Sequence, residues 1–191
     1  MSHKVGLDKA TVVEEAAKLV DEEGLEQLSL GRLAERLGVR TPSLYNHVAG
    51  LPGLKRDLAL YCLCDLLDRM QRVTIGKSRA EAILAFADAY RAYARQTPGR
   101  YALTLQAPPP GDPELQAVAQ QIVDVVRAVL APYRLSEEEA IHAIRGLRSL
   151  VHGFSSLEIA GGFGMPVDLE ASFQWLIHLF IAGLHRSMVK R

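Results

Sequence analysis

The sequence predicts an all-α fold, and three observations support this prediction. Apolar residues recur every three or four positions along almost the whole chain. No stretch of alternating apolar and polar residues is bounded by hairpin turns. Capping residues, glycines and prolines mark the ends of the periodic segments. We therefore expect a series of helices joined by short loops.

The first two helices have chemically marked ends. We expect the first to begin after Asp8, a capable N-cap, and to end at Gly24. The second should begin at Ser29 and end at Gly38. Each carries its apolar residues on one face: Val12, Val13, Ala16, Ala17 and Val20 in the first, and Leu30, Leu33, Ala34 and Leu37 in the second.

The third expected helix is very short. Thr41 is its predicted cap and Pro42 its first helical residue, where the missing N–H of proline does no harm, and it runs to about Val48. A long fourth helix follows from about Leu51 to Arg72. Further helices are expected at residues 78–95, 98–106, 113–131, 136–160 and 168–189, separated by segments that contain glycine or proline.

Composition and charge describe an ordinary folded chain with an uneven charge distribution. The 191 residues, 49% of them hydrophobic and 23% charged, suit one large domain or two small ones. Lys plus Arg and Asp plus Glu number 22 each, so the net charge does not favour a nucleic-acid partner. Residues 8–26, however, carry seven acids and two lysines, whereas residues 32–56 carry five basic residues and one glutamate. This local basic patch predicts attraction to phosphate.

The two cysteines and the hydropathy indicate a cytoplasmic protein. Cys62 and Cys64 are two residues apart in an expected helix, where their side chains diverge and cannot form a disulfide or share a metal, so a reducing compartment fits best. No segment resembles a signal peptide. The longest apolar run, Trp175 to Leu184, is interrupted by His178 and is too short to span a bilayer. We expect no membrane partner.

Residues 24–48 combine two short helices with a tight turn that contains Gly38. Such a turn lets the second helix cross the first and protrude, so that its first residues can enter the major groove of DNA. The residues expected to point inward are Leu33, Ala34, Leu37, Val39, Leu44 and Val48. Those expected to point outward are Thr41, Ser43, Asn46 and His47.

The outward residues carry short polar groups that suit base edges. Asn46 fits adenine, and the methyl group of Thr41 fits a thymine methyl. Tyr45 can bring its hydroxyl to a phosphate or a base, and Ser29 can donate to the DNA backbone. Taken one at a time, Tyr45 can equally be a half-buried packing residue, and Thr41 and Ser29 can be simple helix caps.

This segment resembles the signature of the TetR family of transcriptional regulators. The matching positions are Gly24, Ser29, Leu33, Ala34, Leu37, Gly38, Val39, Ser43, Leu44, Tyr45, His47 and Val48. The resemblance implies a three-helix DNA-binding domain at residues 1–50 and an effector-binding and dimerisation domain at residues 51–191, with helix 51–72 connecting them. The residues expected to contact operator DNA are Ser29, Arg40, Thr41, Pro42, Ser43, Tyr45, Asn46, His47 and Lys55.

The chain departs from the family pattern at two positions. Many relatives place a phosphate-binding lysine four residues after the histidine, but this chain has Leu51 there. Lys55 and Arg56, one turn further on, are the natural substitutes, although they can equally form a solvated helix face. Val48 stands where phenylalanine is commoner, which is a slight change.

The C-terminal half carries a second, weaker resemblance. Residues 147–163 are similar to the histidine-glycine (WHG) subgroup of TetR C-terminal domains, with Val151 where tryptophan is common. Helices 136–160 and 168–189 are apolar on more than one side, which predicts that they form a four-helix bundle with a second copy of the chain. The alternative is a thick monomeric core. In a dimer, two recognition helices about 34 Å apart would read a palindrome.

The resemblance further implies a repressor that a small hydrophobic effector releases from its operator. The middle helices should enclose an apolar pocket with a few polar groups. Core packing or a surface bond could also explain each candidate residue; the candidates are Tyr90, Tyr93, Tyr101, Gln106, Arg148, His152 and Trp175.

Other classes of function find less support in the sequence. No catalytic set of nucleophile, base and orienting residue emerges, and Glu137–Glu139 after Ser136 suit a capped helix start, so we expect no enzyme. The histidines at positions 3, 47, 142, 152, 178 and 185 have no recognised metal-ligand spacing, and we expect no metal or cofactor. The alternative is that His178 and His185, which share a helix face, bind a metal together with His142 or His152. The proline run 108–110 is read as a stiff connector rather than a docking motif. A helical interaction protein that does not bind DNA remains the rival interpretation.

Overall fold

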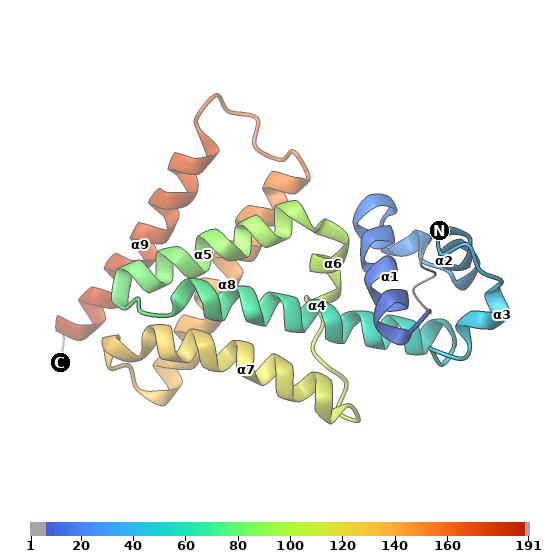
Figure 1. Cartoon of the computed structure of the whole chain (residues 1–191). Coiled ribbons are helices and arrows are strands. Elements are labelled where there is room, and N and C mark those ends of the chain that lie inside the picture. The colour runs from blue at the N-terminus through green and yellow to red at the C-terminus, as the bar shows by residue number, and fades with distance from the viewer. Residues whose placement is uncertain (1–6, 190–191) are drawn as a thin grey trace. The chain divides into compact units, whose positions relative to one another are not determined.

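The computed structural model describes residues 7–189. All the regular secondary structure in that range is helical, so the predicted all-α fold is confirmed. Two of the helices are single 3₁₀ turns, η1 and η2. Figure 1 shows the order of the elements, which are α1 (Lys9–Glu23), η1 (Leu25–Gln27), α2 (Leu30–Arg36), α3 (Thr41–Leu44), α4 (Gly50–Thr74), α5 (Arg79–Gln96), α6 (Pro98–Leu103), α7 (Pro113–Leu130), η2 (Ala131–Tyr133), α8 (Glu137–Ile159) and α9 (Leu169–Val189).

Local capping chemistry sets several of these ends as predicted. The Asp8 carboxylate accepts the backbone N–H of Thr11 at 2.8 Å, and Gly24 ends α1 with φ near 90°. Ser136 and Glu139 form a reciprocal capping box, in which each side chain accepts the backbone N–H of the other. Glu137–Glu139 therefore begin α8 in the way that the sequence predicts.

The start of α3 differs from the prediction. Arg40, not Thr41, is the N-cap, and the cap makes no side-chain hydrogen bond. Pro42 is the second helical residue, where an N–H still has no helical partner and its loss costs nothing. The α-helix ends at Leu44, but the N–H groups of His47 and Val48 both donate to the Leu44 carbonyl, so the chain continues in tight turns to the expected end.

Packing divides the chain into two compact units. The first contains the residues up to Asp65 together with Thr97–Gln116, and the second contains Leu66–Gln96 together with the residues from Ala117 onward. The chain crosses from one unit to the other inside α4, between α5 and α6, and inside α7. Helix α6 and the proline-rich connector therefore pack with the N-terminal helices, although they follow α5 in the sequence.

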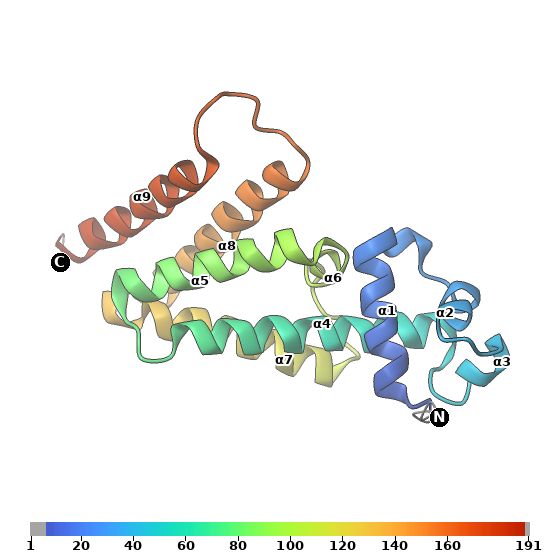
Figure 2. The same cartoon turned by 45° about the horizontal axis from the view of Figure 1, so that its top comes forward.

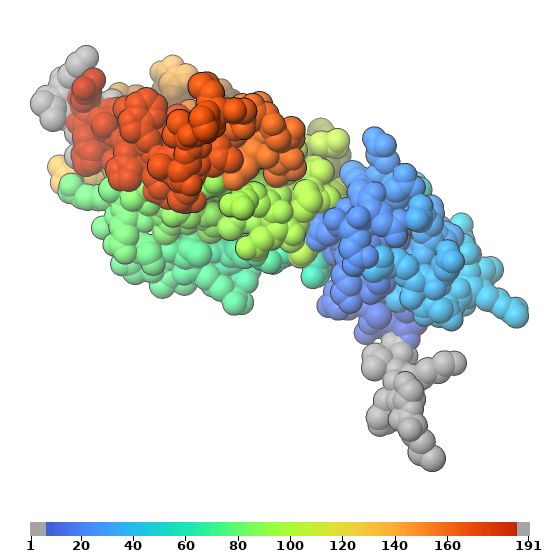
Figure 3. Space-filling model, turned by 90° about the horizontal axis from the view of Figure 1, so that it is seen from above, coloured from blue at the N-terminus to red at the C-terminus, as the bar shows by residue number. Residues whose placement is uncertain are grey.

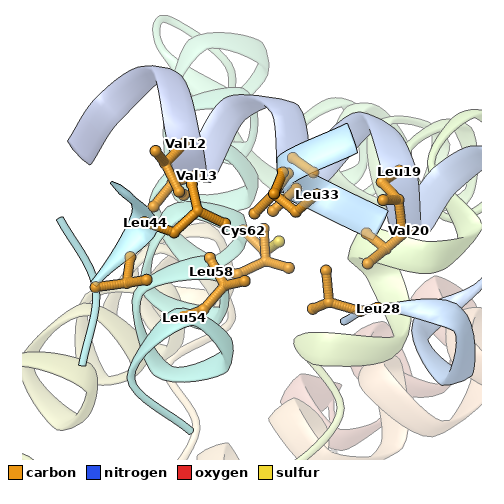
Figure 4. Close-up of a cluster of buried hydrophobic side chains, with 14 residues drawn as sticks. Val12, Val13, Leu19, Val20, Leu28, Leu33, Leu44, Leu54, Leu58 and Cys62 are labelled. Carbon is orange, nitrogen blue, oxygen red and sulfur yellow. The ribbon is translucent and has the colours of Figure 1, made fainter. Parts of the chain in front are cut away.

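The core of the first unit gathers aliphatic side chains from α1, α2, α3 and α4 (Figure 4). Leu33, Leu44, Leu54 and Leu58 are completely buried in it. Leu37 and Val39 pack against it from the turn between α2 and α3 and are half-buried. The positions expected to point inward thus do so, with these two at the margin.

Helix α6 is held closely against α1 within the same unit. A Cβ atom at Gly99 would overlap the backbone carbonyl of Val20, so only glycine allows this approach. The backbone N–H of Arg100 donates to Asp21 at 2.9 Å, and its guanidinium contacts Asp21 at 2.5 Å and Asp65 of α4 at 3.0 Å. These contacts leave α6 little freedom to move relative to α1.

In the second unit, α5 packs against α8 and α9 (Figure 2). Arg91 of α5 is only 4% exposed and binds two carboxylates. Its Nε and Nη2 lie 2.7 and 2.8 Å from the Glu158 carboxylate, and its Nη1 lies 2.6 Å from Glu170. The guanidinium also stacks over the rings of Phe154 and Phe173 at 5.3 and 4.7 Å. This cluster joins the end of α8 and the start of α9 to α5.

Two other expectations can be compared with the structure. Cys62 is buried, Cys64 is exposed, and neither forms a disulfide. Between residues 7 and 189, no helix combines the length and the apolar character that crossing a membrane requires.

Arg91→Met should lower the free energy of unfolding by about 3–5 kcal/mol, because it leaves a nearly buried carboxylate without its partner. Urea denaturation measures this loss. The hydrogen bond from Arg91 lowers the pKa of Glu158, so the contribution of this pair should be complete above the ordinary glutamate pKa of about 4.3 and decline as the pH falls through the lowered value.

Arg95→Met is the matched control. Arg95 lies 3.6 Å from the same Glu158 carboxylate, but its side chain is 54% exposed. Its replacement should change the free energy of unfolding by less than about 1 kcal/mol. If both variants lost the same free energy of unfolding, burial of the Arg91 ion pair would not be the cause of its larger contribution.

Candidate nucleic-acid interface

The turn between α2 and α3 fixes the direction of the projecting segment. Gly38 adopts φ near 65°, a left-handed conformation that glycine adopts without strain. The N–H of Val39 donates to the Ala34 carbonyl at 3.0 Å and the N–H of Gly38 donates to the Glu35 carbonyl at 3.1 Å, which closes the end of α2. Arg40 is then extended, and α3 begins in a new direction against α2.

Two buried side chains hold the segment that follows. Leu44 is completely buried and Val48 is 4% exposed. Between and before them, Pro42, Tyr45 and Asn46 are exposed, and Tyr45 has 61% of its surface accessible. Thr41, Ser43 and His47 are half-buried, so they point outward less fully than the sequence predicts.

The exposed surface of this segment offers unused hydrogen-bonding groups. Among the described residues, the side chains of Tyr45 and Asn46 have no hydrogen-bond partner. An amide can pair with adenine through two hydrogen bonds, and hydroxyl groups can donate to or accept from bases and phosphates. Ser29 caps α2 by accepting the N–H of Arg32 at 3.3 Å, which leaves its hydroxyl hydrogen available to donate.

Ion pairs neutralise much of the basic patch that the sequence suggests. Arg36 binds Glu15 at 2.9 Å and Glu22 at 2.6 Å, both on α1. Arg32 binds Glu23 at 2.5 Å. Acids of residues 8–26 on α1 therefore pair with arginines of α2. A count of charges along the sequence consequently overestimates the number of cations that are available to DNA.

The first turns of α4 carry the phosphate-binding candidates. Leu51, which replaces the lysine common in relatives, is half-buried against the core. Lys55, one turn further on, is exposed and has no ion-pair partner among the described residues. Arg56 is paired with Asp112 and Glu114, so it is not available in this arrangement. Of the basic residues at 32–56, Arg40 and Lys55 are the two without an acidic partner in the described part of the chain.

The seven predicted effector residues do not all lie together. Tyr101 and Gln106 belong to the first compact unit, and Gln106 is exposed. In the second unit, Arg148 and Trp175 are exposed. The remaining three are partly or fully enclosed there: Tyr90 and Tyr93 are buried on α5, and His152 is half-buried on α8.

Sequence reasoning did not single out two buried hydroxyl groups. The hydroxyls of Ser155 on α8 and of Tyr133 at η2 are buried and make no hydrogen bond. A buried hydroxyl without a partner is unfavourable by about 1–3 kcal/mol. A sequence pattern cannot reveal such groups, because serine and tyrosine in apolar helices usually find a partner.

The second unit also carries a surface groove of about 350 Å³. Its walls come from the end of α4, the turn that follows it and the C-terminal half of α7, namely Gln71, Thr74, Ile75, Lys77, Val125, Ala128 and Val129. None of the predicted effector residues lines it. The groove is thus separate from the tyrosines of α5 that the sequence favours.

Structural contacts account for the histidines that suggested a metal alternative. The Nδ1 atom of His178 lies 2.7 Å from the Gln174 carbonyl, and the ring of His185 packs edge-on against Tyr133. Within the described range, no group of three histidine, cysteine, aspartate or glutamate side chains could hold a metal ion.

Comparison with known proteins gives a consistent result. Residues 83–180 match the family model described as tetracyclin repressor-like, C-terminal domain. YobS of Bacillus subtilis, named an uncharacterized HTH-type transcriptional regulator, is 37% identical over 185 residues, which cover 96% of this chain and 96% of that protein. Rv0681 of Mycobacterium tuberculosis, which bears the same description, is 37% identical over 181 residues, 94% of this chain and 83% of that protein.

The fold also matches solved structures. A TetR variant from Acinetobacter baumannii AYE, crystallised in complex with minocycline, has a TM-score of 0.72 at 23% identity. The match covers 96% of this chain and 99% of that one.

Proposed function

The chain belongs to the TetR family of transcriptional regulators, and we propose that it is a repressor that a small, largely apolar effector releases from a palindromic operator. The prediction that it is not an enzyme is confirmed, because its relatives are regulators. The assignment to the histidine-glycine subgroup stays a prediction.

The projecting segment 41–47 is the observation that carries the proposal. It is held by Leu44 and Val48, and it presents Tyr45 and Asn46 without internal partners. Asn46 reads a base, and Tyr45 contacts a phosphate or a base. The remaining proposed contacts come from the segment itself and its flanks: Ser29, Arg40, Thr41, Pro42, Ser43, His47 and Lys55. Residues 1–50 would thus form the DNA-binding domain, and helix 51–72 would connect it to the rest.

Helix α9 supports the proposed homodimer. One face is buried and carries Phe173, Ile177 and Ile181. Another face exposes Trp175 at 66% and Leu179 at 50%. Figure 3 shows the surface formed by α9 (red) and the α8–α9 connection (orange). An exposed apolar stripe beside a buried one favours a second copy of α8 and α9 as its cover, as in a four-helix bundle.

The proposed effector site lies in the second unit, at the buried tyrosines of α5. Tyr90 and Tyr93 offer aromatic surface, and the unpartnered Ser155 hydroxyl on the adjacent helix α8 offers a polar anchor. His152 on α8 is the next candidate. Arg148 and Trp175 are exposed, and Tyr101 and Gln106 belong to the first unit, so these four are weaker candidates. The neighbouring TetR variant was solved with minocycline, which is consistent with a small-molecule effector here.

The coupling from effector to DNA would pass through α6. The connection from α5 leads directly into α6, and Gly99 and Arg100 bind α6 tightly to α1. A displacement of α6 therefore carries α1 and the packed helices α2 and α3 with it. To change operator occupancy from 99:1 to 1:99, the effector must favour the released form by about 5.5 kcal/mol.

Selection of bound sequences from a random DNA pool tests the repressor proposal. We expect enrichment of a palindrome whose half-sites are about one helical turn apart. Repeating the selection with candidate ligands identifies an effector by the loss of enrichment. If no sequence is enriched at moderate salt, the rival interpretation, a helical interaction protein, replaces this one.

Two substitutions separate base contacts from phosphate contacts. Asn46→Ala should weaken binding to the selected operator by about 1–3 kcal/mol and relax the preference at one base pair. Lys55→Ala should weaken binding to all sequences alike and reduce the salt slope by about one unit. Fluorescence anisotropy at several salt concentrations measures both effects. If the two variants showed the same loss of affinity, the same base preference and the same salt slope, the roles of Asn46 and Lys55 would be wrongly assigned.

Trp175→Glu should convert the dimer to a monomer, because it places a charge in the proposed apolar interface. Sedimentation analysis measures the mass, and operator affinity should fall together with dimerisation. Gln121→Glu adds the same charge to an exposed position of α7 and should leave the dimer intact. A Trp175→Glu protein that remains dimeric would exclude this face as the interface.

A further inference from the structure

The Arg56 side chain, on the second turn of α4, is engaged by the connector between α6 and α7. Its Nε and Nη2 lie 2.7 and 2.8 Å from the two oxygens of Asp112, and Nη2 also lies 2.6 Å from Glu114. The contact with Asp112 is a bidentate fork, the geometry in which a guanidinium also binds phosphate. Two carboxylates thus occupy the donors that a DNA phosphate would use.

The neighbouring charges show what this pairing does to the start of α4. Asp57 pairs with Lys9 at 2.8 Å and also lies 3.4 Å from Nη1 of Arg56, so it stays beside the guanidinium when the connector moves but is already paired with Lys9. Asp112 and Glu114 pair with Arg56 and not with Lys55, which has no acidic partner among the described side chains. With the connector in place, Lys55 is therefore the cation that this end of α4 offers to DNA, and Arg56 is withheld.

The guanidinium is accessible enough to exchange partners. The side chain of Arg56 is 35% exposed and that of Glu114 is 59% exposed, whereas that of Asp112 is 14% exposed. The pair with Glu114 therefore contributes little to stability, and a phosphate that replaces the Asp112 fork offers the guanidinium an equivalent bidentate partner. Asp112 has a separate structural task, because its Oδ1 accepts the Leu115 N–H at 3.1 Å and caps α7.

The two carboxylates can be withdrawn together. The N–H of Asp112 and the side-chain amide of Gln116 both donate to the Pro109 carbonyl, at 3.1 and 2.9 Å. The last part of the connector is thereby fixed to the start of α7, which carries Glu114. A displacement of this segment therefore removes both acids from Arg56.

We propose that Arg56 binds a DNA phosphate when Asp112 and Glu114 move away from it, and that these two carboxylates otherwise prevent this contact. The position of the α6–α7 connector then sets how many cations the start of α4 offers to DNA. The connector then acts as a competitor of the DNA backbone for one guanidinium. This inference rests on the proposed operator binding and adds an electrostatic control to it.

The test is the double variant Asp112→Asn with Glu114→Gln, which removes both charges and keeps an N-cap on α7. If Arg56 then engages one more phosphate, the slope of log K against log salt should steepen by about 0.9. The corresponding gain in affinity for the selected operator is roughly five- to tenfold near 0.1 M salt. Anisotropy titrations at several salt concentrations measure both quantities.

Adding Arg56→Gln to the double variant should abolish the gain and return the slope to that of the starting protein. Arg56→Gln alone should cost less affinity than it costs in the double variant, because the carboxylates already occupy the guanidinium. Asp68→Asn is the matched control, since it frees Arg72 from an ion pair of 2.9 Å further along α4 and should change neither the slope nor the affinity.

Three outcomes overturn the proposal. If the gain in operator affinity persists when Arg56→Gln is added, the carboxylates act only by electrostatic repulsion of DNA and not through Arg56. A loss of affinity in a double variant that melts at the original temperature means that they position α4. An unchanged slope means that Arg56 does not reach DNA. If the double variant does not fold, Glu114→Gln alone should give a smaller gain of the same kind. Failure of the starting protein to bind any selected DNA would instead remove the proposed function itself.

Discussion

The structure depends on the burial of Leu44 and Val48. A helix as short as α3 is not stable alone, because its few hydrogen bonds cannot offset the entropy lost in forming the first turn. These two side chains enter the core formed by α1, α2 and α4, and they hold the residues between and before them in fixed directions. The exposed polar groups of Tyr45 and Asn46 are therefore presented by a rigid scaffold, although they lie on a segment without intrinsic stability.

The ion pairs divide the arginines of the N-terminal region into two kinds. Arg32 and Arg36 bind acids of α1 and hold α2 in place, and Arg56 binds the connector. Arg40 and Lys55 are left for an external partner. A chain with no net charge can thus still present unpaired cations to a polyanion, because the local charge distribution sets the potential at the surface.

The sequence predicted the features that depend on local chemistry. The caps at Asp8 and Ser136 and the turn at Gly38 each involve residues that are close together in the sequence, so a local sequence pattern predicts them. Position 41 was assigned wrongly as a cap: threonine is the better capping residue, but the fold places Arg40 at the cap without a side-chain hydrogen bond, so packing overrides the local preference. The Arg91 cluster, the close approach at Gly99 and the pairing of Arg56 join residues far apart in the sequence, and no periodicity reports such contacts.

The continuous chain connects the two compact units. The chain crosses between the units inside two continuous helices, α4 and α7, and at the junction of α5 and α6. Beside each crossing, a contact inside the first unit holds the chain to its neighbours there: Arg100 with Asp65 near the crossing in α4, Gly99 against α1 after α5, and Asp112 with Arg56 at the start of α7. In the proposed mechanism, a rearrangement in the second unit would reach α1–α3 through the continuous chain and these contacts of the first unit, and the proposed release of Arg56 would change charge as well as position.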